Sequence, residues 1–159
     1  MTTVAQAFTN VYARAAWGNE GGRSGPGSSE LQASGASRIV FHLIMALNLQ
    51  SMIDAPCGAM VWQTPLLHQI VFNVPGFRFL GIDVVNSVVE KNNQRFAHQW
   101  ASIKNVTKFN PEFSVNFAQA NLADKDWSVP RGHDLLLCRD ALQHNKLRHV
   151  WRILYNFAE

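Results

Sequence analysis

The chain has 159 residues, of which 47% are hydrophobic, and carries 14 Lys and Arg against 11 Asp and Glu. This length fits one domain, and so apolar a chain can bury a core, which excludes an intrinsically disordered protein. The formal net charge of +3 includes no Lys/Arg block, so there is no clear nucleic-acid signal.

Predicted elements alternate between helix and strand from residue 51 onward. In chain order the pattern predicts a helix over 2–17, a Gly/Ser/Pro-rich loop over 18–29, a helix over 30–47, a strand over 51–55, a helix over 61–72, a strand over 77–84, a helix over 86–100, strands over 114–120 and 134–138, and a helix over 145–157. Alternation of this kind predicts a three-layer α/β fold with a mostly parallel sheet.

Two regions follow from this order of elements. Residues 1–29 form an N-terminal helix and a long loop of the kind that covers binding sites, and residues 30–159 form the α/β domain. Cys57 and Cys138 are too few for a disulfide framework. No apolar run reaches the roughly 20 residues of a membrane span, and no signal peptide is evident. We therefore expect a soluble, cytoplasmic protein without a membrane partner.

Polar side chains follow the ends of the predicted strands, where ligands of parallel α/β sheets bind. Asp54 ends the first strand, and Gly58 in the turn after it removes a side chain that would block the approach of a ligand. Asp83 ends the second strand and is placed to accept ribose hydroxyls. Asn121 follows the third strand and could meet an adenine amino group. Cys138, Arg139 and Asp140 lie at the end of the fourth strand. An Asp at one strand end alone is more often a cap or turn residue, but the four strand ends in this order are specific.

The order strand–D-A-P-C-G, strand–G-x-D, strand–N-L and strand–C-R-D resembles the class I S-adenosylmethionine-dependent methyltransferases. The tract W-G-x-E…S-G-P-G-S from Trp17, the V-x-K-N-N pattern from Val89 and the L-C-R-D-x-L-x-H block from Leu137 resemble a subgroup of uncharacterised methyltransferase-like proteins. The resemblance implies a Rossmann-like fold, S-adenosylmethionine as cofactor and methyl transfer as the reaction. It also implies that the loop after Trp17 folds over the cofactor.

The predicted cofactor site combines the residues that the resemblance implies, Asp54, Gly58 and Asp83, with neighbours at the strand ends and one residue of the loop. The full predicted set is Trp17, Asp54, Ala55, Pro56, Gly58, Trp62, Asp83, Val84, Asn121, Leu122, Cys138 and Arg139. No cluster of His, Cys, Asp or Glu has the spacing of a metal site, so no metal is expected.

Asp140 and His144 are the candidate catalytic residues. They follow the fourth strand four residues apart, so they would share one face if a helix began there. His144 is then the predicted base that removes a proton from an oxygen or nitrogen acceptor on a small-molecule substrate, and Asp140 either orients His144 or contacts the substrate. In the alternative interpretation, Asp140 caps the last helix and His144 is a surface residue.

Departures from the family pattern favour an alternative function, a catalytically inactive methyltransferase-like protein that binds the cofactor or acts as an interaction partner. Pro56 and Met60 stand at two positions that are commonly glycine, Ala59 stands where the subgroup has an acid, and Asn121 stands where the family has an acid. About seven strands make a complete class I domain, and four are evident here. We expect C-terminal strands to be missing, and a homodimer to cover the open sheet edge. A dehydrogenase is disfavoured because G-x-G-x-x-G is absent.

Overall fold

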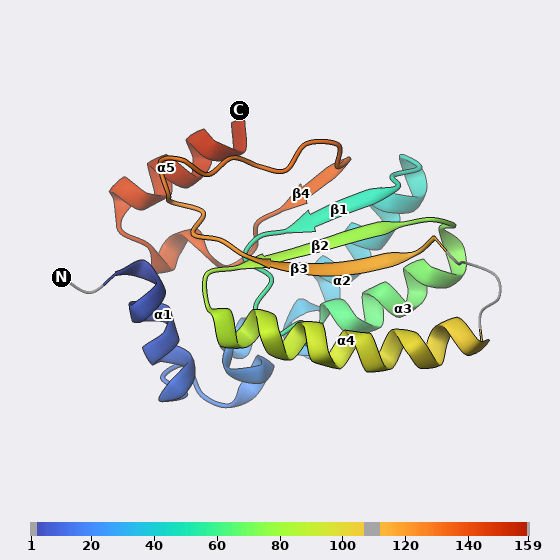
Figure 1. Ribbon diagram of the computed structural model, residues 1–159, viewed down its shortest axis with the longest axis horizontal. Helices are drawn as coiled ribbons and strands as arrows, with labels where there is room; N and C mark the ends of the chain where they lie inside the picture. Colours follow the sequence, from blue (N-terminus) through green and yellow to red (C-terminus); the bar gives the residue numbers. More distant parts are fainter. Residues whose placement is uncertain (1–2, 107–111, 159) are drawn as a thin grey trace.

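A computed structural model describes residues 3–106 and 112–158 and confirms the α/β Rossmann-like prediction (Figure 1). The elements in chain order are α1 (Val4–Ala13), η1 (Glu20–Arg23), η2 (Pro26–Ser28), α2 (Glu30–Ala46), β1 (Ser51–Asp54), α3 (Gln63–Asn73), β2 (Arg78–Asp83), α4 (Asn86–Val106), β3 (Ser114–Gln119), β4 (Leu135–Leu137), η3 (Leu142–His144) and α5 (Leu147–Ala158). The η elements are short 3₁₀ helices.

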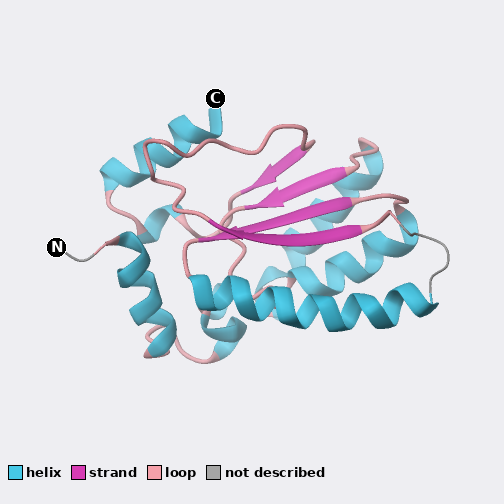
Figure 2. Cartoon of the chain, in the orientation of Figure 1, coloured by secondary structure: helices cyan, strands magenta, loops and turns pink. Residues whose placement is uncertain are grey.

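The sheet has four parallel strands in the order β3-β2-β1-β4 (Figure 2). The register places Asp54 opposite both Gly81 and Leu137, and Asp83 opposite Gln119. Because all four strands point the same way, the polar residues that end them meet at one edge of the sheet. β1 lies between two neighbouring strands and all four of its residues are buried, including the polar Ser51 and Asp54 at its two ends.

Helices α2, α3 and α4 cover one face of the sheet (Figure 1). The strands alternate, so that Met52 of β1 and Phe79 of β2 point into this layer while the next residue of each strand points away. The helices contribute apolar residues at helical spacing, including Val40 and Ile44 of α2 and Leu67, Ile70 and Val71 of α3. This layer holds the larger core and fixes the position of the turn after β1.

Residues 120–134 and helix α5 cover the other face. Ile53 and Ile82 of the sheet pack there with Leu122 and with Ile153 of α5. The buried side chain of Asn156 donates hydrogen bonds to the carbonyl oxygens of Leu122 and Asp124, both at 2.8 Å. These bonds hold the irregular segment after β3 against α5, so Asn121 and Leu122 have fixed positions beside the strand ends.

Several boundaries differ from the prediction. Residues 18–29 are not a structureless loop, since they contain η1 and η2, with Gly21 and Gly22 at φ values of +57° and +64° that favour glycine. Ser29 then caps α2, because its side chain accepts the Gln32 N–H. Helix α4 extends to Val106 rather than 100, and the last helix begins at Leu147 rather than 145. The first predicted helical residue, Thr2, lies outside the described residues.

Strand β4 pairs with β1 on one side, and the structure describes no strand on its other side. Leu135, Leu136 and Leu137 are only partly buried there. A partly apolar edge of this kind can pair with another chain, and the homodimer stays a prediction. Across residues 3–106 and 112–158, none of the helices combines the length and apolarity that a membrane crossing requires.

Candidate functional site

A cavity of about 90 Å³ lies at the carboxyl edge of the sheet, beneath α1 and the segment that follows it. It brings together most of the predicted cofactor residues and both candidate catalytic residues. Those that line it are Trp17, Asp54, Pro56, Gly58, Trp62, Asp83, Val84, Asn121, Leu122, Cys138, Arg139, Asp140 and His144. Ala55 does not line it, because it is fully buried in the core on the α5 side, where its N–H donates to the Leu137 carbonyl.

Asp83 holds the turn after β1 in place. Its Oδ2 accepts the Gly58 N–H at 3.0 Å and its Oδ1 accepts the Val85 N–H at 2.9 Å. Burial raises the pKa of this carboxyl, and the hydrogen bonds from the backbone act in the opposite direction. A carboxylate offers about four lone-pair positions, so both oxygens keep capacity for further donors. Asp83 therefore has free acceptor capacity for a ligand that brings hydroxyl groups.

Asp54 and Gln63 form a buried polar pair in the floor of the cavity. Gln63 Nε2 donates to Asp54 Oδ2 at 2.6 Å and to the Cys57 carbonyl oxygen at 2.8 Å. These two acceptors fix the orientation of the amide, and the buried Gln63 Oε1 has no hydrogen-bond partner among the described residues. Burial raises the pKa of Asp54 to about 7, so protonation of this carboxyl relieves an unpaired buried charge.

Gln63 was not predicted from the sequence. It lies in the first turn of α3 and is 3% exposed, so its carbonyl oxygen is a buried acceptor that lacks a donor. Such a group costs free energy unless a ligand or water satisfies it. The only sequence indication was its place, nine residues after Asp54 and just beyond the turn. Helix N-termini that follow such turns commonly face the ligand.

The N-terminal segment 3–29 is bonded to the turn after β1. Tyr12 Oη and Ser24 Oγ lie 2.7 Å apart, and Ser24 Oγ also accepts the Ala59 N–H at 3.0 Å. Burial, followed by the proximity of Asp83, raises the pKa of the Tyr12 hydroxyl above its usual range, so Tyr12 stays protonated. Neither Tyr12 nor Ser24 was predicted as a site residue, because only the tertiary fold brings this segment to the strand ends.

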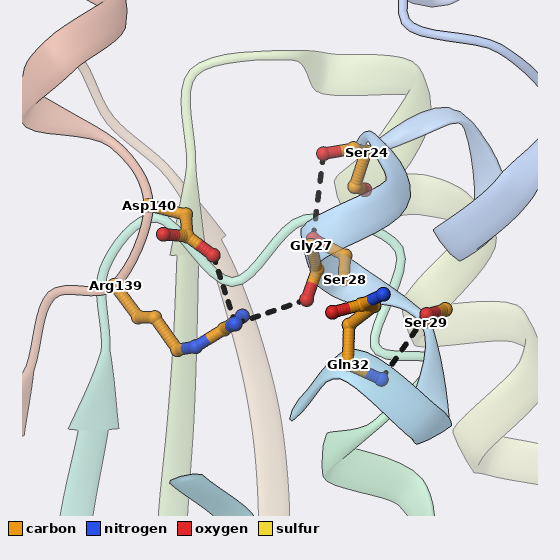
Figure 3. Close-up of polar contacts among 7 residues, drawn as sticks. All are labelled: Ser24, Gly27, Ser28, Ser29, Gln32, Arg139 and Asp140. Carbon is orange, nitrogen blue, oxygen red and sulfur yellow. Dashed lines mark hydrogen bonds and ion pairs between the residues drawn. The ribbon is translucent and has the colours of Figure 1, made fainter. Parts of the chain in front are cut away.

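Arg139 joins the same segment to the end of β4 (Figure 3). Its Nη2 donates to the Gly27 carbonyl oxygen at 3.0 Å and pairs with Asp140 Oδ2 at 2.9 Å. Its guanidinium also lies 5.6 Å from the centroid of the Trp62 ring. In this structure Arg139 therefore connects the N-terminal segment to the end of β4, and it also lines the cavity as a predicted cofactor-site residue.

Asp140 and His144 do not share a helix face. Asp140 has φ of +52° and lies outside the short η3, in which His144 is the last residue. In the alternative interpretation, Asp140 does not cap the last helix, because α5 begins seven positions later at Leu147, whereas His144 is exposed, as that interpretation expects. A left-handed φ interrupts any helix, so the assumed helical start at Asp140 was the error. Both residues nonetheless line the cavity, where the His144 ring lies with its centroid 4.7 Å from that of Trp17 and is tilted by 34° against it.

The cysteines are poor nucleophiles. Burial raises the pKa of the Cys57 thiol well above its usual range and that of Cys138 to about 11. Both thiols therefore stay protonated at neutral pH, and thiolate chemistry requires the opposite shift. Within the described part of the chain, no group of three or more His, Cys, Asp or Glu residues is arranged to hold a metal ion.

The cavity combines buried acceptors with apolar and aromatic walls. Asp54, Gln63 Oε1 and Asp83 offer oxygen acceptors at its floor, and Phe8, Trp17 and Leu122 are among its apolar lining residues. A ligand that matches this arrangement carries a cationic amine, hydroxyl groups and a flat apolar ring. The amino acid, ribose and adenine of S-adenosylmethionine have this chemistry, so the residues present fit that cofactor.

Comparison with known proteins identifies the fold. No known family model matches the chain, and no curated protein sequence matches it. Two solved structures of the methyltransferase domain of bacterial CtHen1 are similar to this chain. The CtHen1-C structure matches 74% of this chain with a TM-score of 0.53 and 21% sequence identity. The CtHen1-CN structure matches 78% of this chain with a TM-score of 0.54 and 20% sequence identity. The matches cover 55% and 58% of those chains, so this chain spans little more than half their length. The chain therefore has the α/β fold of methyltransferase domains.

Proposed function

We propose that this chain is an S-adenosylmethionine-dependent methyltransferase domain that acts on an oxygen or nitrogen of a small molecule. The observation that carries the proposal is the group of buried acceptors, Asp54, Gln63 Oε1 and Asp83, at the carboxyl edge of a methyltransferase-like sheet. Asp54 and Gln63 would hold the ammonium of the cofactor, and Asp83 would accept its ribose hydroxyls. Asn121 and Leu122 would lie against the adenine.

The reaction needs little from the protein beyond alignment and proton removal. When bound, S-adenosylmethionine supplies an electrophilic methyl group on a positively charged sulfur. His144 would accept the proton of the attacking hydroxyl or amine, because it lines the cavity and carries a titratable ring. The Asp140 carboxylate forms an ion pair with Arg139. Asp140 would therefore neutralise the charge of Arg139 and would not orient His144.

The N-terminal segment must move before a ligand of this size can enter. The cavity of about 90 Å³ is small against the ~300 Å³ at the lower end of ligand pockets. The residues that narrow it include Tyr12, Ser24 and Trp17, all from the segment 3–29. This closure favours a second candidate, a methyltransferase-like protein without catalysis, in which the segment stays closed over the site.

Calorimetric titration with S-adenosylmethionine and, separately, with NAD distinguishes the candidates. Methyltransferase function requires saturable binding of S-adenosylmethionine alone. If the folded protein binds neither compound, the methyltransferase proposal is wrong and the closed, inactive candidate is favoured. Saturable binding of NAD alone would contradict both, because the chain would then be a nucleotide-binding protein of another class.

Cofactor binding is expected to depend on pH through Asp54. The pKa of Asp54 is raised to about 7, and a cationic amine beside it would lower that pKa, so binding releases a proton. Affinity for S-adenosylmethionine should rise as the pH increases from 6 to 8 and then level off. Titrations in two buffers of different ionisation enthalpy at pH 6.5 would measure the released proton. In Asp54→Asn the affinity should be lower and the pH dependence absent, and a pH dependence retained in that variant would contradict this role.

The same shift fixes the sign of the pH dependence of stability. Since the folded protein binds this proton more tightly than the unfolded chain, the contribution of Asp54 to the free energy of unfolding falls as the pH rises from about 4 to about 7. Denaturant unfolding at several pH values should therefore show a decrease over this range that is smaller in Asp54→Asn. An equal decrease in both proteins would assign the effect to other groups.

A further inference from the structure

A second hollow, of about 460 Å³, lies between the N-terminal segment and α4, on the other side of the turn that follows β1. Residues of α1, η1, the turn and the first half of α4 line it. They are Thr9, Tyr12, Ala13, Gly22, Arg23, Ala59, Ser87, Val88, Lys91, Asn92 and Arg95. Only Tyr12 also lines the cofactor cavity, so this groove is a separate site.

The groove is cationic. Arg23, Lys91 and Arg95 contribute three positive charges, and its described lining includes no Asp or Glu. None of the ion pairs between described residues involves any of the three. Thr9 and Ser87 add hydroxyl groups that can donate hydrogen bonds, whereas the buried Asn92 amide already donates to the Gly58 carbonyl oxygen. Positive charge that collects in one concave place without a neighbouring carboxylate attracts an anion.

Arg95 is the most constrained of the three cations. Its Nη2 donates to the Met60 carbonyl at 3.0 Å and to Thr64 Oγ1 at 2.9 Å, which fixes the guanidinium at the base of the groove. Its Nε is buried and has no hydrogen-bond partner among the described residues. Burial lowers the pKa of Arg95, and no neighbouring negative charge opposes this shift. The group is therefore a held cation whose hydrogen-bonding capacity is incompletely used.

We propose that this groove binds a phosphate-bearing small molecule. Phosphate oxygens match the planar fork of an arginine and the ammonium of a lysine, and they also accept hydrogen bonds from hydroxyl groups. The volume of about 460 Å³ lies within the ~300–1,000 Å³ of small-molecule pockets, which favours a compact ligand over a polymer. Such an anion would hold Arg23 of the N-terminal segment against Lys91 and Arg95 of α4.

Titration with inorganic pyrophosphate, in the absence of S-adenosylmethionine, tests the proposal without depending on the cofactor site. Saturable binding is expected with a Kd of about 1 mM or tighter, together with a higher unfolding temperature. Lys91→Gln removes one exposed cation of the groove and should weaken binding about threefold to tenfold. Lys146→Gln is the matched control. It removes an exposed cation directly before α5 and outside the groove lining, so no change in binding is expected.

Arg23→Gln provides a second variant on the opposite wall, where Arg23 is exposed and its loss should not unfold the domain. It should weaken pyrophosphate binding as Lys91→Gln does. The proposal is wrong if pyrophosphate does not bind saturably, or if Lys146→Gln weakens binding as much as Lys91→Gln. Binding of a short oligonucleotide without binding of pyrophosphate would also overturn it, in favour of a nucleic-acid surface. None of these outcomes depends on whether S-adenosylmethionine binds.

Discussion

Asp83→Asn is expected to weaken S-adenosylmethionine binding by roughly tenfold to 100-fold, because hydrogen bonds to a charged carboxylate contribute more than those to a neutral amide. The carboxylate has two further tasks, since it accepts the N–H groups of Gly58 and Val85. Asn has one acceptor oxygen in place of two, so the turn after β1 also loses a hydrogen bond. Calorimetric titration with S-adenosylmethionine measures the affinity, and denaturant unfolding measures the change in stability.

Asp134→Asn is the matched control for this prediction. Asp134 Oδ2 also accepts a backbone N–H, from Gln50 at 2.8 Å, and a second hydrogen bond from Ser51 Oγ at 2.9 Å. It lies at the opposite end of the sheet, where β1 and β4 begin, and far from the cavity lining. This variant should lose stability without losing affinity. If both variants weaken binding equally, the effect of Asp83→Asn is one of general destabilisation and Asp83 does not bind the cofactor.

Gly58→Ala is expected to release the N-terminal segment from the turn. Gly58 has φ of +57°, and an added Cβ would lie 2.7 Å from Ser24 Oγ and 3.4 Å from the Tyr12 hydroxyl oxygen. Both the left-handed backbone and the close contact oppose the larger residue, so the free energy of unfolding should fall by roughly 1–3 kcal/mol. The freed segment should also be cut faster by trypsin after Arg14 and Arg23, as limited proteolysis followed by mass spectrometry would show.

Gly132→Ala is the control that separates the cost of a strained backbone from the release of the N-terminal segment. Gly132 has φ of +81°, and nothing lies within 4 Å of the position that its Cβ would take. This variant should therefore lose only the roughly 1 kcal/mol that a left-handed alanine costs, and the rate of cleavage after Arg23 should not change. If Gly58→Ala and the wild-type protein are cleaved at the same rate, the N-terminal segment stays bound to the turn. The contacts of Ser24 and Tyr12 would then not require a glycine at position 58.

The sequence predicted the sheet and the strand ends because these are local features. Continuous apolar runs such as Leu135–Leu137 indicate strands, and the helices between strands make the connections parallel. The run predicts burial on both faces, whereas β4 ends the described sheet and its residues are only partly buried. Once the strands are parallel, Asp54 and Asp83 must meet at one edge. The main failure was at Asp140, which was placed at a helix start although its backbone is left-handed. Its side chain pairs with Arg139, which also bonds the distant Gly27, and periodicity does not report such a contact.

The sequence by itself determined the α/β class, the order of the elements and the polar residues that end the strands, since hydrophobic periodicity and turn residues encode these within short windows. Only the tertiary structure decided that Gln63 carries an unsatisfied buried oxygen, that Tyr12 and Ser24 bond the N-terminal segment to the turn, and that Arg23, Lys91 and Arg95 border one groove. These features join residues from 9 to more than 70 positions apart. Hydrophobic periodicity does not predict contacts between residues so far apart in the sequence, because these contacts form only when the segments pack against one another.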